Sequence, residues 1–404
     1  MKEHLKTALL ILLGLSALYL LGRTWMYESG LFGAANPEPE IYAPARPDYA
    51  PAAVSPARCA VTRGGERMGG QYDAETGEVY EAFKSMLAQA LGLAGEAVPV
   101  PAGDALRLLL LRDGVYFEFS GQIPMPLLAA WLSADTSLGG DIEVVGLAFG
   151  GEGAELFWAD ADGAFYTAAV PIGEPQWPEL PELRPCAFAF EEEYAAALVS
   201  WQLLIEETEP RVSVMASAPP DIQRELPLYA PFLSKLGLSS SSTTSYLRDG
   251  VRVYMDVENG QSCEISPDGA FLFSNPGAPA IGGAQTLAGD VLRAWEAVSL
   301  LEPAMGGARF EVFRAARTDG GTAVELALTV NGVPLLWESA FVEVEGGVAR
   351  RISLKLCRVT IGEDGTLPLP LRQAAVLVDK SGMARLDLRY AAGDGGDLVW
   401  AVRS

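Results

Sequence analysis

The side chains that most often carry enzymatic chemistry are scarce in this sequence. His4 is the only histidine among the 404 residues. If His4 lies on the cytoplasmic side of a membrane, as argued below, histidine-based triads and histidine zinc sites are excluded from the rest of the chain. The four cysteines, Cys59, Cys186, Cys263 and Cys357, are too widely spaced to form a CxxC metal motif. Each lies near an apolar or strand-like run, which predicts buried free thiols, with at least one disulfide as the alternative.

Carboxylates offer a catalytic route that needs no histidine. Two facing carboxyl groups can hydrolyse a glycosidic bond, so the scattered acids Glu118, Glu155, Asp160 and Glu338 would have to converge in the fold. Residues 160–163 resemble the start of a calcium loop but lack its closing glutamate, so a plain turn is predicted. The sequence therefore indicates no catalytic, cofactor-binding or metal-binding residue and no cofactor. A carboxylate-based cell-wall hydrolase remains an alternative.

The charge balance excludes one class of partner. The formal net charge is −23, whereas nucleic acids require a basic face. No nucleic-acid partner is therefore expected, and the acidic surplus is typical of a solvated surface that keeps a domain soluble. Half of the residues are hydrophobic, so there is enough apolar material for two or three packed domains.

An uncharged apolar run occupies residues 8–21. Extended to residues 7–27, it matches the roughly 20 residues that cross the hydrocarbon core of a bilayer. Lys2 and Lys6 precede it and favour a cytoplasmic tail at residues 1–6. The prediction is a single-pass signal anchor in the cell membrane, with the N-terminus in the cytoplasm and the bulk outside.

The residues after this run are of the types found at the interface between a membrane and water. Arg23 can extend to the headgroups, and Trp25 and Tyr27 are residue types that settle at that depth. A cleaved signal peptide is the main alternative, but the first small residues suited to cleavage come only at 33–35. A soluble buried helix is the remaining alternative.

Small residues are grouped inside the predicted anchor. Gly14, Ser16 and Ala17 would let another transmembrane helix approach closely, which makes them candidate contacts for a membrane partner. Ordinary lipid-facing sequence is the alternative explanation for this patch.

The rest of the chain reads as a tether followed by α+β domains. Repeated prolines at residues 28–56 predict an extended tether. Residues 57–185 predict an N-terminal α+β domain. Residues 186–284 predict a middle α+β domain, and residues 285–404 a C-terminal helix laid on an antiparallel sheet.

Several elements can be predicted within these domains. Helices are expected at 78–91, from Pro126, at 194–204, at 222–236 and from Thr286 to residue 301. Residues 106–111 and 115–119 read as a hairpin around Arg112-Asp113-Gly114. Strands are expected at 142–149, 155–158, 165–170, 251–257 and 270–273, and four more follow residue 309.

The order of these features resembles the YycH/YycI family of exported membrane-anchored proteins, and YycH more than the shorter YycI. An anchor and a Pro-rich tether precede the phrase VYFEFSGQIPMPLLAAW, and the middle domain contains LGLSSSSTTSYLRDGVRVYMDV and DGAFLFSN. The last domain contains LTVNGVPLLWESAFVEVEGGVARRISLKL and closes with AAVLVDKSGMARLDLRY. The phrases cover almost the whole chain, although each is a turn-and-strand pattern rather than a chemical signature. Val399 stands where the family often has a proline before the tryptophan.

This resemblance implies a non-enzymatic regulator of a YycG/WalK-like sensor histidine kinase in Gram-positive bacteria, active in cell-wall homeostasis. Its partners would be the kinase in the same membrane and a related YycI-like protein. The alternative from another class is an extracytoplasmic module that binds or inhibits a ligand or peptide of an unrelated pathway.

Overall fold

The computed structural model describes residues 54–72, 74–150, 153–160, 162–173, 177–217, 222–238, 243–281, 285–363, 365–378, 384–391 and 397–403. The predicted tail, anchor and most of the tether, residues 1–53, lie outside this part of the chain. No helix among the described residues is both long and apolar enough to cross a membrane. The described part has the predicted α+β class.

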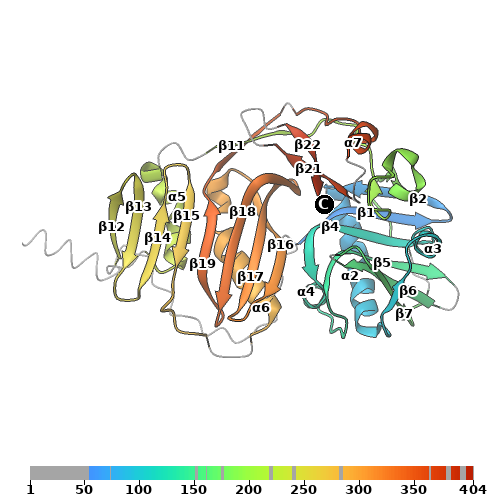
Figure 1. Ribbon diagram of the computed structural model, residues 1–404, viewed down its shortest axis with the longest axis horizontal. Helices are drawn as coiled ribbons and strands as arrows, with labels where there is room; N and C mark the ends of the chain where they lie inside the picture. The colour runs from blue at the N-terminus through green and yellow to red at the C-terminus, as the bar shows by residue number, and fades with distance from the viewer. Residues whose placement is uncertain are drawn as a thin grey trace, which may run out of the picture. The chain divides into compact units, whose positions relative to one another are not determined.

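The N-terminal region is built on an antiparallel sheet, which we call the first sheet. Its strand order is β3–β7–β6–β5–β4–β1–β2–β8 (Figure 1). The strand bounds are β1 Pro56–Arg63, β2 Glu66–Gln71, β3 Val98–Val100, β4 Gly114–Pro124, β5 Asp141–Gly150, β6 Gly153–Asp160, β7 Phe165–Val170 and β8 Arg184–Pro185.

Each face of the first sheet buries its own core. Helices α2 (Ala74–Leu93) and α4 (Met125–Trp131) contribute apolar residues to the core on one face. Helix α3 (Asp104–Leu110) and the segment that follows β8 contribute to the core on the other face. Both α2 and α4 confirm predicted helices, and Pro126 lies in the first turn of α4 as expected.

Two predicted elements were wrong. Residues 106–111 form helix α3 rather than a strand, because Leu106, Leu109 and Leu110 are buried at helical spacing while Leu108 is exposed. The helix expected at 194–204 is replaced by short 3₁₀ turns and strands. The short elements of the region from residue 187 to residue 204 are β9 Ala187–Phe188, η2 Ala189–Glu191, η3 Glu193–Ala195 and β10 Leu203–Leu204, with β9 paired to β10.

The strands between residues 243 and 355 build a second antiparallel sheet, which we call the second sheet. Its order is β12–β13–β14–β15–β19–β18–β17–β16. The bounds are β12 Thr243–Arg248, β13 Val251–Asp256, β14 Gln261–Ile265, β15 Ala270–Ser274, β16 Arg309–Arg317, β17 Thr322–Val330, β18 Val333–Glu345 and β19 Val348–Lys355. The predicted middle and C-terminal sheets are therefore joined edge to edge, because β15 pairs with β19.

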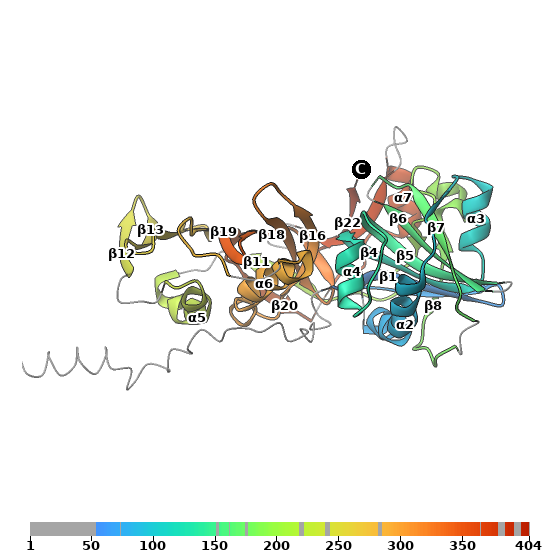
Figure 2. The same cartoon turned by 90° about the horizontal axis from the view of Figure 1, so that it is seen from below.

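Two predicted helices contribute to the core of the second sheet. Helix α5 (Ile222–Lys235) packs through Phe232, whose ring lies 5.0 Å from that of Phe271 on β15. Helix α6 (Leu287–Ser299) begins at Thr286, whose hydroxyl accepts a hydrogen bond from the Gly289 N–H at 3.0 Å. Figure 2 shows α5 and α6 on one side of the second sheet. Short helix η4 (Glu302–Met305) follows α6.

The chain then returns to the N-terminal region. Strand β20 (Arg358–Gly362) pairs with β11 (Ser213–Ser217), and helix α7 (Leu371–Leu377) shares an apolar core with η3. Strands β21 (Arg385–Tyr390) and β22 (Leu398–Arg403) then form an antiparallel hairpin. This hairpin, which we call the C-terminal hairpin, contacts the first sheet through the charged residues described next.

Candidate functional site

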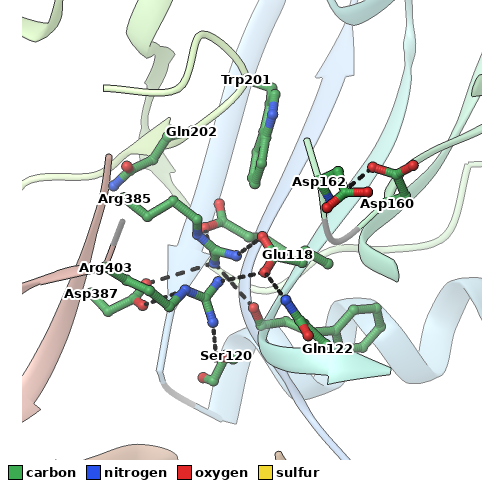
Figure 3. A network of polar contacts seen from close by, with 12 residues as sticks. Glu118, Ser120, Gln122, Asp160, Asp162, Trp201, Gln202, Arg385, Asp387 and Arg403 are labelled. Atoms are coloured by element: carbon green, nitrogen blue, oxygen red, sulfur yellow. Dashed lines mark hydrogen bonds and ion pairs between the residues drawn. The ribbon is translucent and has the colours of Figure 1, made fainter. Parts of the chain in front are cut away.

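Charged side chains are buried where the C-terminal hairpin meets the first sheet (Figure 3). Burial of even one charge is unfavourable unless partners compensate it, so such a group marks a site with a specific structural or functional role. We call the group the ionic cluster. Its members are Arg58, Glu118, Glu143, Arg385, Asp387 and Arg403.

The first half of the ionic cluster follows from strand register. Arg58 on β1 is directly opposite Gln71 on β2 and Glu118 on β4, so the three side chains share one face of the first sheet. Arg58 Nη1 lies 2.6 Å from Glu118 Oε1, and both side chains are almost completely buried. The other Arg58 nitrogen, Nη2, donates to the carbonyl oxygen of Leu386 in the C-terminal hairpin.

Arg385 brings the second half of the cluster into the same space. One of its nitrogens lies 2.7 Å from Glu118 Oε1 and the other 2.7 Å from Glu143 Oε2. Its guanidinium also lies over the ring of Trp201, 5.2 Å from the centroid. One arginine from the C-terminal hairpin therefore holds two carboxylates of the first sheet.

Asp387 is the cluster's carboxylate on the hairpin. It is 1% exposed, and it accepts no hydrogen bond from any described residue. Burial alone would raise the pKa of Asp387, but the surrounding arginines outweigh this effect and lower it to about 2. The arginines are Arg58 and Arg385 at 3.6 Å, and Arg389 and Arg403 at 3.8 Å.

Gln202 holds the hairpin backbone in the manner of a neighbouring strand. Its side-chain amide donates to the Leu386 carbonyl at 2.8 Å and accepts from the Leu386 N–H at 3.0 Å. Gln202 is fully buried, so both of these bonds are shielded from water. These two bonds fix the backbone of the C-terminal hairpin to the segment before β10.

The acids considered for catalysis have separate partners. Glu118 shares Arg385 with Glu143, so a guanidinium lies between the two carboxylates of the cluster. The carboxylate of Glu155 pairs with Arg112, and Asp160 accepts from two N–H groups of its own turn. The side chain of Glu338 lies outside the described part. The ionic cluster therefore acts as a fixed contact between the C-terminal hairpin and the first sheet.

A second junction joins the two sheets. The register of β4 against β5 shifts between Glu118 and Ile123, and this bulge brings Gln122 opposite Arg314 of β16. A Cβ atom on Gly121 would lie only 1.9 Å from the Phe313 carbonyl oxygen. Glycine is therefore required where the backbones of β4 and β16 approach each other.

A cavity of about 10 Å³, the room of roughly one water molecule, lies at this junction. Val54 and Ser55, the last tether residues before β1, line it together with Gly121, Glu311 and Thr329. Burial raises the pKa of Glu311 to about 7, although the Thr329 hydroxyl donates to its carboxylate at 3.1 Å. The tether thus reaches the folded part beside a carboxyl group that titrates near neutral pH.

None of the four cysteines forms a disulfide in the described part of the chain, and all except the half-buried Cys186 are buried, in agreement with the first of the two cysteine predictions. Cys59 belongs to the core beneath α2, whereas Cys186 packs against the core on the opposite face of the first sheet. These two thiols are separated by the sheet itself. Burial raises the pKa of Cys186 to about 12, which keeps it protonated and unreactive at neutral pH.

The residues predicted to contact the membrane or a transmembrane partner all precede residue 54. Gly14, Ser16, Ala17, Arg23, Trp25 and Tyr27 all lie outside the described residues. Sequence reasoning missed the ionic cluster, and the one relevant pattern in the sequence pointed the other way. The run Arg385-Leu386-Asp387-Leu388 alternates charge with leucine, and such alternation usually means that the charged face meets water.

Comparisons with known proteins give distant structural likenesses. No family model matches the chain, and no curated protein matches its sequence. The crystal structure of YycH from Bacillus subtilis aligns over 87% of this chain and 94% of that one, with 9% identity and a TM-score of 0.49. An uncharacterized protein from Eubacterium rectale aligns over 51% of this chain and 77% of that one, with 11% identity and a TM-score of 0.32. The chain is thus distantly similar to YycH in structure, at a level too low to bear on function.

Proposed function

We propose that this protein is a membrane-anchored extracytoplasmic regulator that modulates a two-component sensor histidine kinase. The anchor at residues 7–27 would contact the kinase in the membrane, and the folded part would act outside. The choice of a kinase as partner is supported by the sequence phrases that resemble the YycH/YycI family. A related YycI-like protein would be a further partner.

The proposal is supported best by the position at which the tether joins the folded part. Val54 and Ser55 line the cavity between β4 and β16, beside Glu311. A change in how the two sheets meet would therefore act on the residues that lead to the anchor. This coupling suits a protein that would signal by shifting its transmembrane helix.

Binding can be tested with the full-length chain and the candidate sensor kinase expressed together in one membrane. We expect the kinase to co-purify with the native chain and to be lost when residues 1–30 are replaced by an unrelated single-pass anchor. Gly14→Leu should weaken co-purification, because a large side chain would separate two close helices. Leu18→Ile is the matched control and should leave it unchanged. Equal recovery of the kinase with native and replaced anchors would contradict transmembrane recognition.

A further inference from the structure

The free edge of the second sheet is formed by β12, which pairs with β13 and with no other described strand. Their six residue pairs are in continuous register, from Thr243 opposite Asp256 to Arg248 opposite Val251. Asp249 and Gly250 make the two-residue turn, both with positive φ, at 50° and 84°. This is the turn geometry of a tight antiparallel hairpin.

The turn determines which backbone groups of β12 point outward. In a two-residue hairpin the residues that flank the turn, Arg248 and Val251, form a hydrogen-bonded pair. Hydrogen-bonded pairs recur at every second residue, so Tyr246 also bonds to β13. Ser245 and Leu247 alternate with these positions and direct their N–H and C=O groups away from the sheet. No described residue bonds to those groups.

This edge lacks the devices that usually prevent strand addition. It contains no proline, lysine or bulge, and its single charge, Arg248, pairs with Glu264 at 3.1 Å. Tyr246 and Leu247 are 42% and 58% exposed, on opposite faces of the strand. An extended strand could therefore add to β12 and cover apolar surface on both faces.

We propose that β12 pairs antiparallel with β12 of a second copy of this chain, with the two-fold axis at Tyr246. This inference does not depend on the kinase proposal. In this register Ser245 bonds to Leu247 of the second copy and Leu247 bonds to its Ser245, giving four backbone hydrogen bonds. The bonds use the outward groups identified above.

The side chains are compatible with this register. The two Tyr246 residues are directly opposite in a non-hydrogen-bonded pair, where cross-strand side chains are closest and aromatic pairs are favourable. Thr244 faces Arg248 of the second copy, and no like charges are opposite. This self-complementarity is the reason to choose a second copy over an unrelated strand.

The pairing is expected to be weak and to depend on salt. A single strand edge buries much less than the roughly 1,200 Å² of a stable interface. Each chain carries a formal net charge of −23, so two copies repel each other at long range. Added salt screens this repulsion, and we therefore expect association to strengthen as ionic strength rises.

Cysteine cross-linking of the full-length chain in membranes tests the register. Under mild oxidation Tyr246→Cys should form a disulfide-linked dimer, because residue 246 faces its own copy. Thr244→Cys is the matched control on the same strand and face, and it should not cross-link alone. A mixture of Thr244→Cys and Arg248→Cys chains should cross-link, because these positions face each other. The parent chain, with its own four cysteines, gives the background.

A second variant separates pairing from folding. Ser245→Pro removes an outward N–H but no bond to β13, so it should leave the melting temperature unchanged. In the Tyr246→Cys background it should abolish the cross-linked dimer. The proposal is overturned if Tyr246→Cys gives no dimer, or if Thr244→Cys alone dimerises equally. A cross-link only to a different protein would also overturn it, since the occupant would then be another chain.

Discussion

Replacing Arg385 with methionine should lower the free energy of unfolding by about 3–5 kcal/mol, the usual effect of breaking a buried ion pair. The variant leaves Glu143 without its 2.7 Å partner and removes one of the two arginines on Glu118. Asp387 also loses one of the arginines that keep it ionised. Urea unfolding of the full-length chain, followed by tryptophan fluorescence, measures the change.

The matched control is Arg351→Met. Arg351 pairs with Glu343 at 3.8 Å, but both side chains are 59% exposed, so its loss should change stability by less than about 1 kcal/mol. Adding Glu118→Gln to Arg385→Met should cost less than the sum of the two single changes, because the removed groups are partners. Equal losses for Arg385→Met and Arg351→Met would show that the ionic cluster does not hold the hairpin.

The second large effect concerns pH and Glu311. Burial raises the pKa of Glu311 to about 7, above the 4.5 expected for a free side chain. Between these values the folded chain binds more protons than the unfolded chain, so stability falls as pH rises. The facing groups are Thr329, Arg309 and Glu302; the first two oppose this shift and Glu302 reinforces it. Above pH 7 the ionised carboxylate should cost about 3 kcal/mol.

Glu311→Gln keeps the shape of the side chain and removes its titration. We expect the variant to be more stable than the parent chain at about pH 8 and nearly equal to it at about pH 4, where Glu311 is mostly protonated in both the folded and the unfolded chain. Thermal unfolding across this range measures the difference. Glu343→Gln, which removes a carboxylate at an exposed position, is the matched control for the loss of one charge. Parallel pH profiles for Glu311→Gln and the parent would contradict a raised pKa for Glu311.

Local patterns predicted most of the second sheet. The cap at Thr286 and the apolar spacing after it identified α6, and paired Gly and Asn turn residues identified the strands that follow. These signals are short-range, because a cap or a two-residue turn is specified by neighbouring residues. The strand assigned to 106–111 failed because a short apolar run fits either a strand or a buried helix.

The ionic cluster could not be predicted, because its pairs are remote in sequence. Arg385 and Glu118 are 267 residues apart, and only the return of the hairpin to the first sheet brings them together. The sequence shows each charge as part of an alternating strand, for which a solvent-facing side is the ordinary expectation. The junction cavity could not be predicted either, because no residue near Glu311 in the sequence indicates that β4 will lie beside Glu311 in the fold.

On the kinase proposal, the two junctions would have different roles. The ionic cluster fixes the C-terminal hairpin to the first sheet, whereas the cavity lies where the first and second sheets meet and where the tether ends. If the proposal is right, a signal that reached the second sheet would act on the tether through the β4–β16 junction. On the kinase proposal, variants at this junction should change kinase output while leaving the anchor intact.

Kinase output is the most direct test of the proposed regulation. The sensor kinase is reconstituted in vesicles with the full-length chain, with the chain whose residues 1–30 are replaced by an unrelated anchor, or alone, and its autophosphorylation rate is measured. We expect the native chain to shift this rate and the anchor-replaced chain to leave it unchanged. An identical rate in all three preparations would contradict the proposed regulation.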